Sequence, residues 1–233
     1  MTDDELRAKV LEIDRRLTAL YHPPEEPPYT DPIDELVLTI LSQNTNDRNR
    51  DLAFRRLRER FPTWEAVRDA PLEAVIEAIR PAGLAQTKAP RIQEVLRTIT
   101  AREGKLSLDF LRTMPLEEAR AWLTSLKGVG PKTAAIVLLF SLGRPAFPVD
   151  THVHRVSKRL GLIPPGTSRE RAHTLLEAII PPERYLPFHL ALIEHGRAIC
   201  RARAPRCELC PLRDLCDAYQ RSHGGEEDGT PSG

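Results

Sequence analysis

The chain has 233 residues, of which 41% are hydrophobic, so it can bury a substantial core as one large domain or two small ones. Its 34 Lys and Arg residues nearly balance its 33 Asp and Glu residues, and the formal net charge is +1. This balance excludes a uniformly basic protein, so any nucleic-acid binding must use a local basic surface. The first residues are acidic and polar and no apolar run approaches membrane length, which predicts a cytosolic protein with no signal peptide and no membrane contact.

Helix signals follow one another from the N-terminus. Thr2 is a candidate N-cap for a first helix whose apolar residues recur at helical spacing, and the proline-rich segment 22–28 must end that helix. Asp31 opens a second helix together with the proline that follows it. Asn46 or Asp47 is expected to cap a third helix, which is rich in arginine.

The rest of the chain is also predicted to be helical. The expected elements are 64–67, 72–79, a long amphipathic helix through 92–99, a helix opened by Pro115, and 151–160, 168–179 and 185–199. No stretch alternates convincingly between apolar and polar residues with a period of two, so the predicted fold class is all-α. The segment 221–233 is polar, glycine-rich and acidic, and we expect it to be a disordered tail.

A glycine-rich stretch in the middle of the chain carries the first functional signal. Gly128 and Gly130 allow positive φ and a close approach of the backbone that residues with a Cβ resist. Pro131 is favoured in the first turn of a helix, and the apolar residues after it predict a buried helix. Backbone N–H groups of Gly128, Val129 and Gly130 would form an anion site, and Lys132 lies beside it. The stretch therefore predicts a clamp for a DNA phosphate that also carries a reactive amine.

The four cysteines of the chain are confined to 17 residues near its C-terminus, in a C-x6-C-x2-C-x5-C pattern. They are Cys200, Cys207, Cys210 and Cys216. In a reducing compartment such clustering favours a metal centre over disulfides. Thiolates suit both zinc and an iron–sulfur cluster, and the spacing alone does not choose between them.

The first interval between these cysteines is strongly basic, since it contains Arg201, Arg203 and Arg206 and no acidic residue. Such a loop could simply be a solvated basic surface. Alternatively, a metal centre stiffens the loop so that the arginines reach DNA phosphates. We favour the second interpretation, because ordering a charged loop in this way serves little other purpose.

Together, the hairpin 126–130, Lys132, Asp150 eighteen residues later and the cysteine spacing resemble the endonuclease III family of DNA glycosylase/AP lyases. This family belongs to the helix-hairpin-helix superfamily, and the resemblance extends from about Ile33 to Cys216. It implies two helical domains with a DNA-binding cleft between them and a 4Fe–4S cluster on the four cysteines.

The resemblance also implies domain boundaries. A continuous helical-barrel domain with the helix-hairpin-helix motif would span residues 33–145. An iron–sulfur domain would combine residues 1–32 with residues 146–220.

The resemblance implies a catalytic pair. Lys132 would attack C1′ of the damaged nucleotide, expel the base and form a Schiff base that permits β-elimination, and the positive end of a helix favours the neutral amine that this attack needs. Asp150 would stabilise the positive charge that develops at the sugar and assist proton transfers. Asp150 also precedes a predicted helix, where Asp is a favoured N-cap worth about 1 kcal/mol, and both roles can hold together.

Two loops are candidates for filling the space that an extruded base leaves in the DNA, since unstacking costs a few kcal/mol. By resemblance one wedge is Leu84, although it could equally be a residue that packs its own loop. The other lies in the polar segment that contains Gln43 and Asn44, where the sequence departs from the usual pattern of the family and places Asn44 at the aligned position.

Three further residues match the family by position. His152 and Arg155 are expected to steady the acidic site, and His152 is also expected to contact DNA, although a lone histidine is more often a structural one. His195 is expected beside the cysteine centre.

We therefore predict a bifunctional DNA glycosylase/AP lyase that removes oxidised pyrimidines of the thymine glycol type from damaged double-stranded DNA. We expect it to act as a monomer and, in a bacterium, to be associated with the nucleoid. One alternative is a monofunctional adenine or mismatch glycosylase, against which Lys132 argues. Another is a glycosylase for thymine in mismatches or ultraviolet dimers. A third is a non-catalytic helix-hairpin-helix DNA-binding protein, in which replacing Lys132 would change only affinity.

Overall fold

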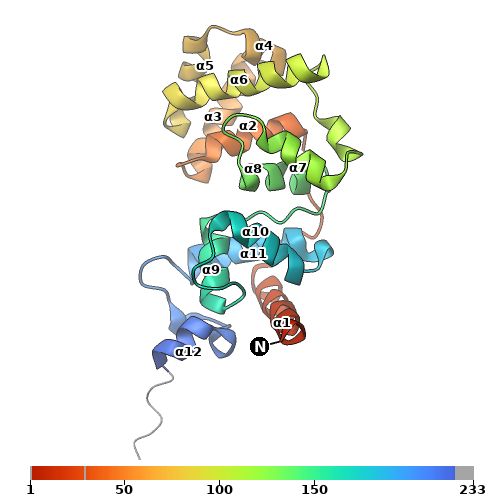
Figure 1. Cartoon of the computed structure of the whole chain (residues 1–233). Helices are drawn as coiled ribbons and strands as arrows, with labels where there is room; N and C mark the ends of the chain where they lie inside the picture. Colours follow the sequence, from red (N-terminus) through yellow and green to blue (C-terminus); the bar gives the residue numbers. More distant parts are fainter. Residues whose placement is uncertain (1, 29, 224–233) are drawn as a thin grey trace, which may run out of the picture. The chain divides into compact units, whose positions relative to one another are not determined.

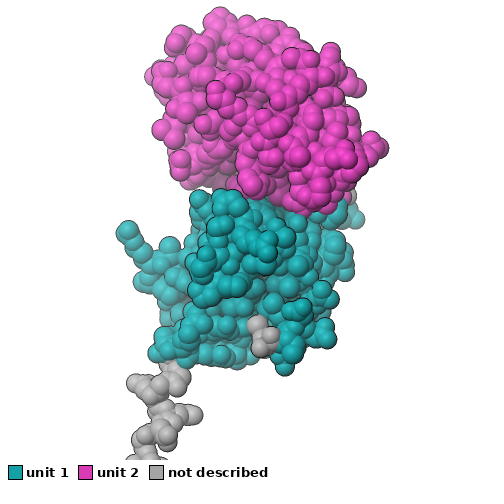
Figure 2. All heavy atoms as spheres, viewed as in Figure 1, with its two compact units in different colours: residues 1–27, 145–233 teal, residues 28–144 magenta. Residues whose placement is uncertain are grey.

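The computed structural model describes residues 2–28 and 30–223. All regular secondary structure in these described residues is helical, which confirms the predicted all-α fold (Figure 1). The chain divides into two compact units, residues 28–144 and residues 1–27 with 145–233 (Figure 2). No helix among the described residues is long and apolar enough to cross a membrane.

The unit of residues 28–144 is a helical domain in which α2, α3 and α4 begin at side-chain caps. Its α-helices are α2 (Pro32–Ser42), α3 (Asp47–Arg60), α4 (Trp64–Asp69), α5 (Leu72–Ile79), α6 (Ala85–Glu103), α7 (Leu116–Thr124) and α8 (Pro131–Ile136). The Asp31 side chain accepts hydrogen bonds from the first N–H groups of α2, and Asn46 caps α3 in the same way. Both predicted helix starts are therefore confirmed.

Helices α2 and α6 provide much of the core of this unit. Leu36 and Ile40 of α2 are completely buried, as are Ile92 and Leu96 of α6. Helix α6 packs against α4 and α5, while α2 packs against α3 and α8. Burying apolar area in this way is the main stabilising contribution, on the order of 25 cal/mol per Å². The core thus fixes α2, α6 and α8 relative to one another.

The other unit combines the N-terminal helix with helices from the C-terminal part of the chain. It contains α1 (Asp3–Tyr21), α9 (Thr151–Leu160), α10 (Arg169–Ile179), α11 (Tyr185–Ala198) and α12 (Asp217–His223), with α11 packed against both α1 and α9. Thr2 caps α1, as predicted, and together with Glu5 it forms a capping box. An ion pair between Arg184 and the buried Asp14, at 2.5 Å, further ties the C-terminal segment to α1.

One prediction about the C-terminus is wrong. Residues 221–223, predicted as part of a disordered tail, complete α12, while the rest of that predicted tail, 224–233, lies outside the described residues. Helix α12 is held at its start, because the Asp217 carboxylate forms an ion pair with Lys9 at 2.6 Å. The same carboxylate also lies where a Cβ on Gly161 would be, and Gly161 has φ of 77°, so a larger residue there would be strained and would displace the carboxylate.

Candidate active site

The hairpin before α8 closes through a backbone hydrogen bond from the Val129 N–H to the Leu126 carbonyl, at 3.0 Å. Gly128 has φ of 81°, the left-handed conformation that a type II turn requires at this position. The predicted role of Val129 as a backbone donor to phosphate is corrected, because the turn already uses its N–H group. The buried Val129 side chain instead anchors the hairpin in the core.

Gly130 differs from Gly128 in a way that the sequence does not reveal. Its φ is −95°, which any residue can adopt, so the expectation of positive φ holds for Gly128 alone. A Cβ added to Gly130 would meet no atom within 4 Å. Neither backbone strain nor packing therefore requires glycine at position 130, which leaves the approach of a ligand as a reason for it.

Lys132 lies at the start of α8, where the sequence places it, and is half-buried. Beyond α8 the helix widens into the π-helical turn η3 (Val137–Ser141), a distortion that is frequent at functional sites. The charge of Lys132 influences the pKa of Glu35, a residue of α2. Burial raises the pKa of Glu35, while hydrogen bonding by Thr30 and the charges of Arg50 and Lys132 oppose that rise. The N-terminus of α8 is thus an electrostatically coupled, partly desolvated environment for an amine.

The two predicted wedge loops lie in the same unit as this hairpin. Leu84 is 58% exposed and has φ of 50°, and it is the residue that precedes α6. Its exposure argues against the alternative that it packs its own loop. Asn44 is likewise exposed and has φ of 54°, whereas the Gln43 side chain is drawn inward and accepts a hydrogen bond from Arg91 at 2.8 Å. Of the two polar candidates, Asn44 is the one at the surface.

Asp150 is the N-cap of α9, as the sequence predicts. Its Oδ1 accepts a hydrogen bond from the Val153 N–H at 2.7 Å, and the residue is half-buried. His152 follows within the first turn of α9, and its Nδ1 lies 3.1 Å from Nη2 of Arg155. Arg155 also donates to the Gly196 carbonyl at 2.9 Å, so it joins α9 to α11 rather than contacting Asp150.

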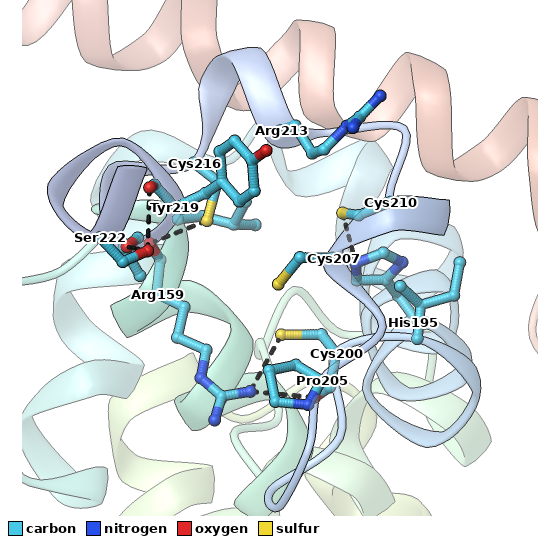
Figure 3. Close-up of a pocket in the computed structure, with 13 residues that line it drawn as sticks. Arg159, His195, Cys200, Pro205, Cys207, Cys210, Arg213, Cys216, Tyr219 and Ser222 are labelled. Atoms are coloured by element: carbon cyan, nitrogen blue, oxygen red, sulfur yellow. Dashed lines mark hydrogen bonds between the residues drawn. The ribbon is translucent and has the colours of Figure 1, made fainter. Parts of the chain in front are cut away.

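The four cysteines, each half-buried, line one cavity of about 130 Å³ in the unit of residues 1–27 and 145–233. Figure 3 shows their sulfur atoms around a common space, with His195 and Arg159 at its edge. Burial raises the pKa of the Cys210 thiol to about 11, so its thiolate form requires a nearby cation. The buried His195 ring lies with Nε2 3.5 Å from the Cys210 sulfur, as expected of a residue beside the centre.

The arrangement of these cysteines fits both centres that their spacing leaves open. A zinc ion would draw its four sulfurs to about 2.3 Å from one point. The four thiols that line one cavity supply the donor set that a zinc ion or a 4Fe–4S cluster takes, so the geometry is compatible with the cluster that the resemblance implies.

Arg159 is a site residue that the sequence reasoning missed. Its guanidinium donates to the Cys200 sulfur at 3.4 Å and to the Arg201 carbonyl at 2.6 Å. The signal that could have found it is its position one turn after Arg155 on α9, the helix that follows Asp150. Arg201, Arg203 and Arg206, by contrast, are exposed on the cysteine loop, as the proposed role in phosphate contact needs.

The comparisons with known proteins agree with this geometry. Residues 37–182 match the HhH-GPD superfamily of base excision DNA repair proteins, and residues 200–216 match the iron–sulfur binding domain of endonuclease III. A putative DNA glycosylase of Arabidopsis thaliana is 40% identical over 79% of this chain and 66% of its own length. Endonuclease III of Thermotoga maritima is 38% identical over 84% of this chain and 88% of its own.

A solved structure is also similar. It is a trapped covalent intermediate of an endonuclease III with DNA, in an estranged-adenine complex. It superposes with a TM-score of 0.79 at 31% identity and covers 95% of this chain and 99% of the other.

Proposed function

We propose that this chain, which belongs to the endonuclease III family, removes oxidised pyrimidines such as thymine glycol from duplex DNA and then cleaves the strand 3′ to the abasic site. Its membership, and with it the predicted resemblance, is confirmed: the chain is a DNA-binding glycosylase of base excision repair that carries an iron–sulfur cluster. The substrate class and the lyase step are our proposal. The observation that carries them is Lys132 at the start of α8, directly after the glycine hairpin.

The proposed chemistry begins at the amine of Lys132. The neutral amine attacks C1′ of the damaged nucleotide, the bond from C1′ to the base breaks, and the base leaves with a proton. Opening of the sugar ring gives a Schiff base to the lysine, loss of a C2′ proton expels the 3′ phosphate, and water releases the amine. The position of the half-buried Lys132 at the start of α8, directly after the glycine hairpin, supports this role.

Asp150 is proposed to stabilise the positive charge that develops at the sugar and to move protons there. One of its oxygens caps α9 through the Val153 N–H at 2.7 Å. This bond supports the proposal, because it fixes the orientation of the Asp150 side chain at the start of α9. Capping and catalysis are therefore compatible roles for the same side chain.

Contacts with DNA are proposed for two groups of residues. Leu84 and Asn44 would enter the base stack, and the backbone at Gly128 and Gly130 would bind a phosphate. His152 and the three arginines of the cysteine loop would contact further phosphates. The support is the exposure of Leu84, Asn44 and the loop arginines. The monomeric state, the cytosolic location and the nucleoid association remain predictions.

The iron–sulfur cluster would be held by Cys200, Cys207, Cys210 and Cys216. It would act as a structural cross-link, since thiolates from both ends of residues 200–216 would share one centre. Arg159 and His195 would border it, because each already lies against a cysteine sulfur. The cluster would thereby hold the loop arginines in place.

The test of the proposed function uses four duplexes, which carry thymine glycol, uracil, a G·T mismatch or an abasic site. We expect strand cleavage and a borohydride-trapped adduct on the thymine glycol and abasic duplexes. Both signals should disappear in Lys132→Gln. Base release without cleavage would identify a monofunctional glycosylase, and activity confined to the mismatch would identify a thymine glycosylase. DNA binding without either reaction would identify a non-catalytic protein.

A further inference from the structure

Helix α6 carries two cationic residues, Lys88 and Arg91, that the proposed chemistry does not use. They are three residues apart, so they lie on neighbouring positions of one helix face. Lys88 is only 2% exposed, which is rare for lysine, and burial lowers its pKa. Such a residue is costly to keep, so its contacts need an explanation.

The Nζ of Lys88 donates to two backbone carbonyls from different segments. One is Leu41, at 2.7 Å, in the last turn of α2, and the other is Ala82, at 2.8 Å, in the short helix η1 (Arg80–Ala82). Leu41 stands three residues before Asn44, and Ala82 stands two residues before Leu84. Lys88 therefore joins the bases of both proposed wedge loops.

Both loops contain a non-glycine residue in the left-handed region, with φ of 54° at Asn44 and 50° at Leu84. This conformation is strained for a residue with a Cβ and persists only where the surroundings hold it. The Lys88 backbone N–H and that of Thr87 both donate to the Leu84 carbonyl at 2.9 Å. Lys88 thus holds the Leu84 loop by its backbone and by its side chain.

Arg91 connects the glycine hairpin to α6 and also binds the Asn44 loop. Its Nη1 donates to Oε1 of Gln43 at 2.8 Å, beside Asn44. Its Cδ and Nε each lie 2.5 Å from the position that a Cβ on Gly128 would take, so the hairpin backbone rests directly on the Arg91 side chain. The Asn44 loop and the glycine hairpin therefore share one supporting side chain.

We propose that Lys88 and Arg91 are positioning residues that fix the spacing of the Asn44 loop, the Leu84 loop and the glycine hairpin. The proposal rests on the proposed function, because it assigns the three segments to one DNA-bound arrangement. The Asn44 loop, the Leu84 loop and the glycine hairpin must all contact the duplex at the same time for a base to stay extruded. Neither Lys88 nor Arg91 contacts the reacting atoms in this account.

The chain offers a matched control on the same helix. Gln93 is also 2% exposed, and its Nε2 donates to two carbonyls, Val67 at 2.9 Å and Ala70 at 2.8 Å. These carbonyls belong to α4 and its end rather than to the proposed wedge loops. Lys88→Met and Gln93→Met each remove one side chain that donates to two carbonyls, so they separate the positioning of the loops from the stability of α6.

The experiment measures the single-turnover rate on a thymine glycol duplex together with the fluorescence of 2-aminopurine beside the lesion. In Lys88→Met we expect the rate to fall about 100-fold and the fluorescence rise that reports base extrusion to be lost, since displacements of about 1 Å cost this much. In Gln93→Met we expect a rate within about threefold of the wild type at a comparable loss of thermal stability. Equal effects in the two variants, or an unchanged Lys88→Met, would overturn the proposal.

A second pair of variants decides the matter if Lys88→Met does not fold. Arg91 is half-buried, so Arg91→Met should fold, lose the extrusion signal and regain part of it in Arg91→Lys. An intact signal in Arg91→Met would contradict the proposal. If the wild type cleaves none of the duplexes, the proposed function fails, yet the fluorescence of the DNA complexes still tests the positioning role.

Discussion

Two loop systems of this protein are held in different ways. In the unit of residues 28–144, protein side chains hold the proposed DNA-contacting loops, through the buried Lys88 and through Arg91. In the other unit, residues 200–216 contain only two short 3-10 turns and surround a cavity with four cysteines. The first system is held by hydrogen bonds and by packing of protein side chains. In the second, Arg159 donates to the Arg201 and Ala202 carbonyls, but we expect the cluster to order the rest of the loop, so that its basic surface is lost with the cluster.

Removing the cluster should have the largest effect. In Cys210→Ser we expect residues 200–216 to lose amide protection and DNA affinity to fall about tenfold or more at 0.1 M salt, because the loop arginines are no longer ordered. Protection in α6 should be unchanged, because its hydrogen bonds lie in the other unit. Hydrogen exchange and fluorescence anisotropy measure both effects. Preserved protection across residues 200–216 would show that the loop does not depend on the cluster.

Asp150→Asn tests whether the unit that contains the four cysteines also supplies the negative charge that stabilises the sugar during the reaction. Asn is as good an N-cap as Asp, so the cap of α9 and the melting temperature should be retained. The rate of the lyase step should fall by about 10²-fold or more, because the negative charge is removed from the sugar. Single-turnover cleavage of the abasic duplex measures this rate. A rate equal to that of the wild type would leave Asp150 with the capping role alone.

Gly128→Ala should disturb the hydrogen-bonded system. The added Cβ is strained at φ of 81° and meets the Arg91 side chain, so we expect a destabilisation of about 1–3 kcal/mol together with slower cleavage. The control is Gly104→Ala, where φ is 71° but no atom lies within 4 Å of the new Cβ. It should lose a similar or smaller stability, by thermal unfolding, and keep full activity. Equal losses of activity would refute the link through Arg91.

Glu35→Gln should give the smallest effect, on stability and its pH dependence. The folded-state pKa of Glu35 is raised by burial, so the folded protein holds this proton above pH 4.5, where the unfolded chain releases it. The wild type therefore loses stability as the pH rises through the folded pKa, and Glu35→Gln should lack this loss. We expect a higher melting temperature than the wild type at pH 7 and an equal one near pH 4. A lower melting temperature at pH 7 would mean that the charges of Lys132 and Arg50 outweigh burial.

Features that depend on neighbouring residues were predictable from the sequence, whereas contacts between distant segments were not. Capping residues such as Thr2 and Asp31 act on their own neighbours, so the helix starts were predictable from local pattern. Lys88 was missed because lysine is usually exposed. Yet Lys88 precedes Ile92 by four residues, so the helical pattern already places it on the buried face. Its two carbonyl partners come from distant segments, and no local pattern indicates them.

The same distinction holds within the candidate site. The positions of Lys132 and Asp150 at helix starts were predictable, because Lys132 follows Pro131 in the first turn of α8 and Asp150 is itself the N-cap of α9. The use of the Val129 N–H inside its turn, and the contact of Arg159 with the Cys200 sulfur, depend on exact backbone geometry.

The most direct test of the central claim is to identify the amine that forms the covalent bond. The adduct trapped by borohydride on an abasic duplex is digested and its modified peptide is mapped by mass spectrometry. We predict modification of Lys132 alone, with trapping intact in Lys127→Gln, because Lys127 is an exposed neighbour in the same hairpin that pairs with Glu94 at 3.3 Å. An adduct on any other amine, or trapping that survives in Lys132→Gln, would contradict the account.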